Sequence, residues 1–260
     1  MTDRSPRCAR WTRLALGVAL AATTLVALIV QPPTSAGTPY AAPDADAVLG
    51  RDHLGRDVFT GLAASAVRSV HLPIAAACIL LVTGALVGIL IGLSGPRIRA
   101  GVLRVLESML LVPPIVTALV VVSGLGASDV ALVVCVLVIG FAMVTRVIAT
   151  ATVQIAALAH VEMAFGAGTS TLGVAVHEVL PRLDDLLRAE AGIRVIQALQ
   201  LTAAIQFLGF GGGSSWGGMV LNGLPGFTLN PWATLGPGLA LAAMAALVVL
   251  TLDQRAGVPA

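Results

Sequence analysis

The sequence predicts an all-α integral membrane protein with six transmembrane helices, from its composition and from the length of its apolar runs. Of the 260 residues, 57% are hydrophobic and 11% are charged, whereas soluble domains carry about 25% charged residues. A transmembrane helix needs about 17 to 25 consecutive apolar residues. Six runs approach that length, at residues 14–30, 72–93, 109–125, 130–150, 193–210 and 233–252.

The first run follows an arginine-rich tail and has a second interpretation, a cleaved signal peptide ending near Thr34-Ser35-Ala36. We favour a transmembrane helix because the run is long for a signal core. Arginine placement then orients the chain, since positive residues near the membrane stay on the cytoplasmic side. With the N-terminus inside, twelve of the fifteen arginines are cytoplasmic, and only Arg51, Arg56 and Arg68 are external. Both termini are therefore expected in the cytoplasm.

The second run carries Gly84, Gly88 and Gly92 at four-residue intervals, which places them on one helix face and predicts close packing of another helix. The third run begins beside Glu107, and the fourth ends near Arg146. Charges at helix ends usually anchor the helix at the membrane interface, so we assign that role to both.

Polar groups in the fifth run cannot face lipid, because an amide without a partner in hydrocarbon is costly. Gln197 and Gln200 share one face of this helix, and two roles stay open for them: lining a translocation path or bonding to another helix. Ser215 and Trp216 follow the run, in a segment expected to be a flexible external loop, and they are two further candidates for the translocation path. The segment matches the G-x-S-x-G pattern of a hydrolase, but no histidine follows Ser215.

Two connections are too long for simple turns. Residues 31–68 form an external segment, and residues 151–192 form a cytoplasmic segment that reads as helix, break, helix. The break is expected at Gly168-Thr169-Ser170, and Pro181 is expected to end the second helix.

Several chemistries are excluded. Every basic residue is arginine, so the chain has no P-loop lysine and no lysine Schiff base, and any ATP that it uses must be bound by another protein. The net charge of +2 is too small to indicate a basic surface that binds nucleic acid. We expect no metal site and no cofactor, because the histidines lie on two sides of the membrane and the cysteines are widely spaced. The residues concerned are His53, His71, His160, His177, Cys8, Cys78 and Cys135.

The cytoplasmic segment resembles the EAA loop of bacterial ABC importer permeases, in which two short helices dock on the ATPase. The matching positions are Glu162, Ala164, Gly168, Ser170, Leu172 and Pro181, whereas Met163, Phe165 and Ala167 depart from the pattern. His177 flanks the second short helix. Because the usual basic residue is absent at position 165, the docking contact is expected to be more apolar than in other members.

Three further blocks, in order, resemble the dipeptide, oligopeptide and nickel branch of these permeases. The box at residues 49–58 is similar to LGTDxxGRDV, residues 107–113 and Arg146 match the branch around the third and fourth spans, and residues 207–232 resemble its FLGLG, SWG-x-M and PW elements. The resemblance implies an ABC permease domain over residues 48–255. The remaining parts are residues 1–47, with the tail, first helix and external linker, and the C-terminal tail at 256–260.

The resemblance implies that the chain is not itself an enzyme but half of the translocation path of an ATP-driven importer in the bacterial inner membrane. The implied partners are a second permease, two ATPases and an extracytoplasmic solute-binding protein. A different class of protein, an ion-coupled carrier or a membrane anchor, would work without ATPases. A carrier usually shows ionisable residues deep in its spans or an inverted repeat, which the sequence does not reveal. The substrate stays open among peptides, nickel complexes, opines and haem.

The external box also has two interpretations. In the structural one, its charged residues form ion pairs and cap the following helix; in the functional one, they contact the binding protein or the substrate. The box residues are Gly50, Asp52, Gly55, Arg56 and Asp57.

Overall fold

The computed structural model describes residues 37–210 and 215–253, and every regular element in these ranges is helical apart from an isolated bridge between Arg51 and Asp57. The all-α prediction is confirmed for this part of the chain. The expected first span at 14–30 and both tails lie outside it. The described residues fall into two compact units, one holding 37–75, 122–133 and 195–253 and the other holding 76–121 and 134–194.

Four helical stretches in the described part are long and apolar enough to cross a membrane: Val58–Leu93, Asp129–Ala156, Thr171–Phe210 and Trp232–Leu250. A fifth is present if α4 (Pro96–Met109) and α5 (Pro114–Leu125) count as one bent span. The prediction of membrane-spanning helices is confirmed at these places, while the count of six depends on residues that are not described.

The second span begins earlier than the sequence predicts. Helix α2 (Val58–Ala66) passes through a π-helical turn, Val67–His71, into α3 (Leu72–Leu93) without a break. The external segment therefore ends at Asp57 and not at residue 68, because Asp57 caps the helix and nothing after it interrupts helical hydrogen bonding.

The third span is not the single helix expected over 109–125. Helices α4 and α5 are bent by 83°, and Pro113-Pro114 follows the end of α4. Proline removes a backbone donor and disfavours helical geometry in the residue before it. Glu107 consequently lies near the C-terminal end of α4 and does not open a span.

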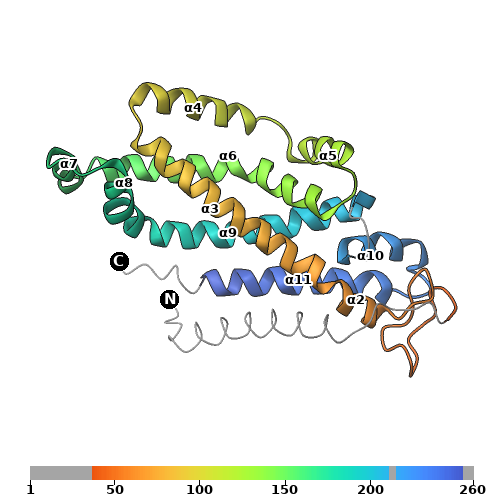
Figure 1. Ribbon diagram of the computed structural model, residues 1–260. Helices are drawn as coiled ribbons and strands as arrows, with labels where there is room; N and C mark the ends of the chain where they lie inside the picture. Colours follow the sequence, from red (N-terminus) through yellow and green to blue (C-terminus); the bar gives the residue numbers. More distant parts are fainter. Residues whose placement is uncertain (1–36, 211–214, 254–260) are drawn as a thin grey trace, which may run out of the picture. The chain divides into compact units, whose positions relative to one another are not determined.

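Helix α6 (Asp129–Ala156) extends six residues past the predicted end of the fourth span, so placing Arg146 at a helix end was wrong. In the unit holding 76–121 and 134–194, α3, α4 and α6 run side by side (Figure 1) around a core of Ile91, Leu106, Ala142 and Ala149.

The three glycines of α3 lie against α6. A Cβ added to Gly84, Gly88 or Gly92 would lie 2.5 to 2.8 Å from a side-chain atom of α6, closer than real contacts allow. The α6 residues met are Val144, Ile148 and Thr152, each 60 residues along the chain from its glycine. Since both sets advance together, the two helices run parallel, and their C-terminal ends lie on the same side.

The other unit is built around α2, α10 (Trp216–Gly223) and α11 (Trp232–Asp253), which pack together. Its core contains Ala66, Val70, Leu199, Trp216, Met244 and Val248. The sixth span was predicted within one residue at either end. The fifth span was not, because α9 (Asp184–Ile205) begins nine residues before the predicted start and continues through a π-helical turn, Gln206–Phe210.

Candidate coupling, gating and external sites

The segment at residues 151–192, which the sequence predicts to be cytoplasmic, contains a helix, a break and a second helix. Helix α7 (Ala159–Gly166) ends in a Schellman motif: the Thr169 N–H donates to the Ala164 carbonyl and the Gly168 N–H to the Phe165 carbonyl, both at 3.0 Å. This motif needs a left-handed residue after the helix, and Gly168 supplies it with φ +85°. Ser170 then caps α8 (Thr171–Val174), accepting from the Gly173 N–H at 3.2 Å. The roles expected for Gly168 and Ser170 in the bend thus have a backbone basis.

Pro181 does not end the second helix, and this expectation was wrong. It lies in a 3-10 turn, Leu180–Leu183, within an unbroken helical run from Thr171 to Phe210. Proline fits the first turn of a helical segment, where no hydrogen bond is required of its nitrogen. The second half of the loop is therefore continuous with the helix of the fifth span.

Glu178 ties the two halves of the loop together. Its carboxylate lies 3.7 Å from the imidazole of His160 on α7 and 3.2 Å from the guanidinium of Arg182. Val161 and Val174 are buried beneath the two halves. His177, expected to flank the docking surface, is exposed, and its Nδ1 lies 3.0 Å from the Gly173 carbonyl oxygen.

The outer face of the loop is apolar. The exposed large side chains are Met163, Phe165, Leu172, Val176 and Leu180, with Leu172 73% exposed. Glu162 is also exposed. An apolar set of this kind on a polar side of a membrane protein marks an interaction surface, and it agrees with the expectation of a more apolar docking contact.

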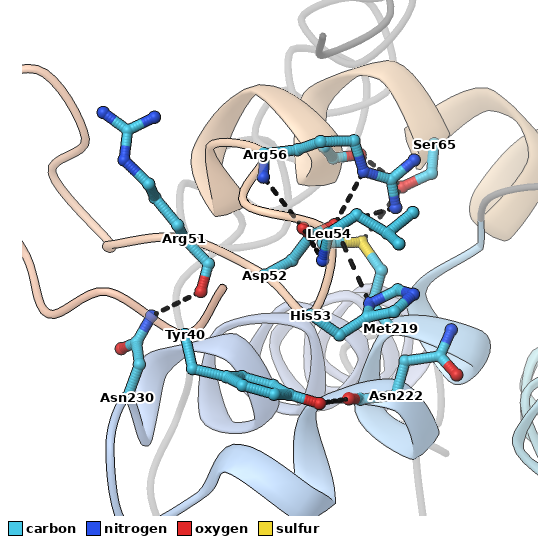
Figure 2. A network of polar contacts seen from close by, with 11 residues as sticks. Tyr40, Arg51, Asp52, His53, Leu54, Arg56, Ser65, Met219, Asn222 and Asn230 are labelled. Atoms are coloured by element: carbon cyan, nitrogen blue, oxygen red, sulfur yellow. Dashed lines mark hydrogen bonds and ion pairs between the residues drawn. The ribbon is translucent and has the colours of Figure 1, made fainter. Parts of the chain in front are cut away.

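The external box folds around the carboxylate of Asp52 (Figure 2). Oδ1 accepts from the Leu54 and Arg56 N–H groups at 2.8 and 2.9 Å, and Oδ2 accepts from Nε of Arg56 at 2.8 Å. Asp57 accepts from the Phe59 and Thr60 N–H groups and caps α2. Asp52 thus makes an ion pair and Asp57 a helix cap, the contacts that the structural interpretation expects; contact with a partner or substrate stays a prediction.

Two glycines let the box close on its neighbours. Gly50 and Gly55 have φ of +68° and +74°. A Cβ would lie 2.5 Å from the Ala41 carbonyl oxygen at Gly50 and 2.0 Å from the Gly37 carbonyl oxygen at Gly55. Glycine alone can adopt this positive φ without strain and has no Cβ to clash with the neighbouring carbonyl oxygen.

Asn230 joins the box to the start of α11. It is fully buried, and its Nδ2 donates to the carbonyl oxygen of Leu49 at 3.0 Å and to that of Arg51 at 3.1 Å. Figure 2 shows the contact with Arg51. The sequence contained no signal for this contact, which joins residues about 180 positions apart. Three of the recognised blocks, the box, the SWG element and the PW element, thus come together in one unit.

We expect Asn230→Ala to lower the free energy of unfolding by about 2 kcal/mol, because it leaves two partly buried carbonyl groups without their donor. Thermal unfolding in detergent measures the change. The control is Asn222→Ala, at an exposed side chain of the same unit, for which a change within about 0.5 kcal/mol is expected. Equal effects of the two variants would contradict the locking role of Asn230.

A cavity of about 280 Å³ opens between the box and α10. Its lining residues are Asp52, His53, Arg56, Ser215, Gly218, Met219 and Asn222. The expectation of a flexible loop at Ser215 was wrong at that residue: it is buried and caps α10, accepting from the Gly218 N–H at 3.2 Å.

The remaining path candidates lie in different surroundings. Trp216 is 5% exposed and packs in the core, and its indole N–H donates to the Leu62 carbonyl oxygen at 2.9 Å. This places its side chain inside the protein and not on an open surface. Gln197 and Gln200 lie on α9 and are exposed. No cluster of three or more metal-ligating side chains occurs among the described residues.

Glu107 and Arg146, singled out separately in the sequence, form an ion pair. The guanidinium of Arg146 lies 3.5 Å from the Glu107 carboxylate. The pair joins α4 to α6 within one unit, and the apolar lengths of the helices gave no sign that the two charges meet.

A family model described as "Binding-protein-dependent transport system inner membrane component" matches residues 84–254. The oligopeptide transport system permease protein OppC of Bacillus subtilis is 24% identical over 75% of this chain and 65% of its own length. The dipeptide transport system permease protein DppC of the same organism is 27% identical over 73% of this chain and 60% of its own length. The di/tripeptide transport system permease protein DppC of Pseudomonas aeruginosa is 27% identical over 75% of this chain and 65% of its own length.

The chain therefore spans less than two thirds of the length of these relatives. The family match covers more than half of the chain and includes α6, the cytoplasmic loop, α9 and α10. This chain belongs to the family of inner membrane components of binding-protein-dependent transport systems.

Proposed function

We propose that this chain is the permease subunit of an ATP-driven ABC importer for dipeptides, oligopeptides or similar small solutes. The observation that carries the proposal is the cytoplasmic loop, a glycine bend with an exposed apolar face, in a chain of this family. The names of the similar proteins refer to peptides, which supports this substrate class for the present chain.

In this proposal the loop transmits ATPase movement to the membrane helices. ATP and magnesium bind on two cytoplasmic ATPases, and closure of the ATPases drives the loops of two permeases together. The loop residues assigned to this coupling are Glu162, Ala164, Gly168, Ser170, Leu172, His177 and Pro181. The inward-open and outward-open states of the permease must make different contacts with the ATP-bound ATPases. Otherwise ATP binding could not change the populations of the two states.

The proposal places the chain in the bacterial inner membrane with both termini cytoplasmic, as the arginine distribution indicates. An extracytoplasmic binding protein delivers solute to the external side, where the box and the cavity beside Ser215 lie. Gln197 and Gln200 are assigned to the path, which two permeases share, and Trp216 supports the external end from inside the core.

Affinity purification from the native membrane tests the proposal, with identification of the proteins recovered. The wild-type chain is expected to bring a second permease and two ATPases. Gly168→Pro is expected to lose the ATPases and keep the second permease, because proline cannot adopt the positive φ of the bend.

Gly168→Asn is the matched control, since asparagine tolerates the left-handed region and nothing lies within 4 Å of an added Cβ. It is expected to keep the ATPases. Recovery of the wild-type chain without any ATPase, in a detergent that keeps another ABC complex intact, contradicts the proposal.

A further inference from the structure

The Glu107–Arg146 ion pair has two properties that a simple helix anchor does not need. Its single contact of 3.5 Å is long, so neither group is held in the close bidentate geometry of a strong pair. The Arg146 and Glu107 side chains are also 48% and 50% exposed in this chain. Both groups therefore keep hydrogen-bonding capacity for a third partner.

The pair lies deep along both helices that carry it. Arg146 precedes the end of α6 at Ala156 by ten residues, a rise of about 15 Å. Glu107 follows the start of α4 at Pro96 by eleven residues, or about 16 Å. Because α3 and α6 pack in parallel, the end of α6 at Ala156 and the start of α4 at Pro96 both lie on the side of the cytoplasmic loop. The two distances agree, and each is about half the thickness of a hydrocarbon layer of about 30 Å.

The side chains on the same exposed stripe of α6 indicate water on the cytoplasmic side of the pair. Thr150 and Gln154 follow Arg146 at four-residue intervals, and both are exposed. The Thr150 hydroxyl donates to the Arg146 carbonyl oxygen at 2.9 Å, so the Gln154 amide is the stronger sign of a polar environment. On α4, Arg104 lies one turn closer to the cytoplasmic loop than Glu107 and is also exposed. On α6, polar side chains thus continue from the ion pair toward the C-terminal end of the helix, whereas α4 also exposes Ile98 and Val105.

The exposed stripe of α3 is the internal comparison. Its large side chains are Ile79, Val82, Leu86 and Leu90, with exposed fractions of 47% to 61%. Thr83 is exposed beside them, and its hydroxyl donates to the Ile79 carbonyl oxygen at 2.8 Å. Leu86 and Leu90 lie at the levels of Arg146 and Thr150, because residues of α3 and α6 at one level differ by 60 in number. At these two levels, α3 exposes apolar side chains that are suited to lipid, whereas α6 exposes polar side chains that are not.

We propose that Glu107 and Arg146 line the water-filled path at membrane mid-depth and bind the charged groups of a zwitterionic solute as it passes. Arg146 takes the carboxylate and Glu107 takes the ammonium group, while the loose ion pair closes the site when no solute is present. This inference rests on the proposed importer function and adds the chemical class of solute, one with both charges free.

The test measures water access and charge preference with thiol reagents, so that it needs no knowledge of the natural solute. The background carries Cys8→Ser, Cys78→Ser and Cys135→Ala, and the probes are Thr150→Cys and Leu90→Cys. Inside-out membrane vesicles containing the whole complex are treated with two membrane-impermeant methanethiosulfonates, one bearing a sulfonate and one a trimethylammonium group.

We expect Thr150→Cys to react at least tenfold faster than Leu90→Cys. Adding Glu107→Gln leaves Arg146 as the unbalanced charge and is expected to raise the sulfonate-to-ammonium rate ratio about fivefold, while Arg146→Gln lowers it by a similar factor. General disruption of the structure would move the ratio in the same direction in both variants and is thereby distinguished.

Equal slow reaction at Thr150→Cys and Leu90→Cys overturns the inference, as does a rate ratio that neither substitution changes. Recovery of the ATPases with the same vesicles separates the two proposals. If the ATPases are present and Thr150→Cys is unreactive, the path assignment fails while the importer function stands; if they are absent, the importer function fails.

Discussion

Replacing Glu190 by alanine is expected to lower the free energy of unfolding by about 3 to 5 kcal/mol. Glu190 and Arg194 lie one turn apart on α9, with side chains 8% and 4% exposed. The Glu190 carboxylate accepts from Nε of Arg194 at 2.8 Å and lies 2.7 Å from its Nη2. Removing the carboxylate takes away an ion-pair partner of a buried cation, and a buried charge cannot regain its hydration. Urea or thermal unfolding in detergent measures the loss.

Two further variants make this prediction specific. The double substitution Glu190→Met with Arg194→Met removes both charges and is expected to recover most of the loss, because apolar replacement of a buried pair is often neutral or stabilising. Asp184→Ala breaks the exposed pair with Arg188 on the same helix, and we expect it to cost less than about 1 kcal/mol. A cost for Glu190→Ala no larger than that for Asp184→Ala would show that burial does not govern this pair.

Replacing Gly88 by valine is expected to cost about 3 kcal/mol. A Cβ at this position would lie 2.8 Å from the Cβ of Ile148 and 2.9 Å from the carbonyl oxygen of Thr145. The second neighbour is backbone, so it cannot move aside as a side chain could. The helices must separate, and the other glycine contacts between α3 and α6 loosen with them. Thermal unfolding and the amount of protein in the membrane both report the effect.

The same substitution at Gly101 is the matched control. Gly101 also lies inside a helix, α4, but nothing is within 4 Å of an added Cβ. Since valine has a higher helix propensity than glycine, Gly101→Val is expected to leave stability unchanged or raise it by about 0.5 kcal/mol. Comparable losses at Gly88 and Gly101 would assign the effect to valine itself and not to helix packing.

Local patterns predicted the helices well where nothing interrupts the chain. The apolar runs at 72–93 and 233–252 correspond to α3 and to α11 within one residue. The run at 109–125 failed because mean hydropathy does not register the Pro113-Pro114 break, although both prolines stand in the sequence. The run ending at residue 150 was too short because polar Thr150 and Gln154 ended the apolar pattern, whereas the backbone of α6 continues through them.

The sites divide in the same way. The glycine bend at Gly168 and the cap at Asp57 depend on residues close in sequence, and their chemistry could be predicted. The contacts of Asn230 with the external box and of Arg146 with Glu107 join distant segments. Nothing in spacing or propensity specifies which buried donor meets which carbonyl, or which face of a helix meets which charge. The four-residue spacing of Glu190 and Arg194 could have predicted their ion pair. Nothing in the sequence predicted that this pair is buried.

The glycine contacts between α3 and α6 also limit how this part of the protein can move. Each glycine receives a side chain of the other helix, and the pattern repeats every four residues, or about 6 Å along the axis. A sliding motion of two or three Å would drive Val144, Ile148 and Thr152 against the backbone between the glycines. The two helices therefore cannot slide past each other by less than one four-residue repeat. We expect α3 and α6 to move as one rigid body in any transport cycle. Any bending that a transport cycle requires then occurs where helices lack such interlocking contacts. One such place is the connection between α4 and α5, where the chain bends by 83°.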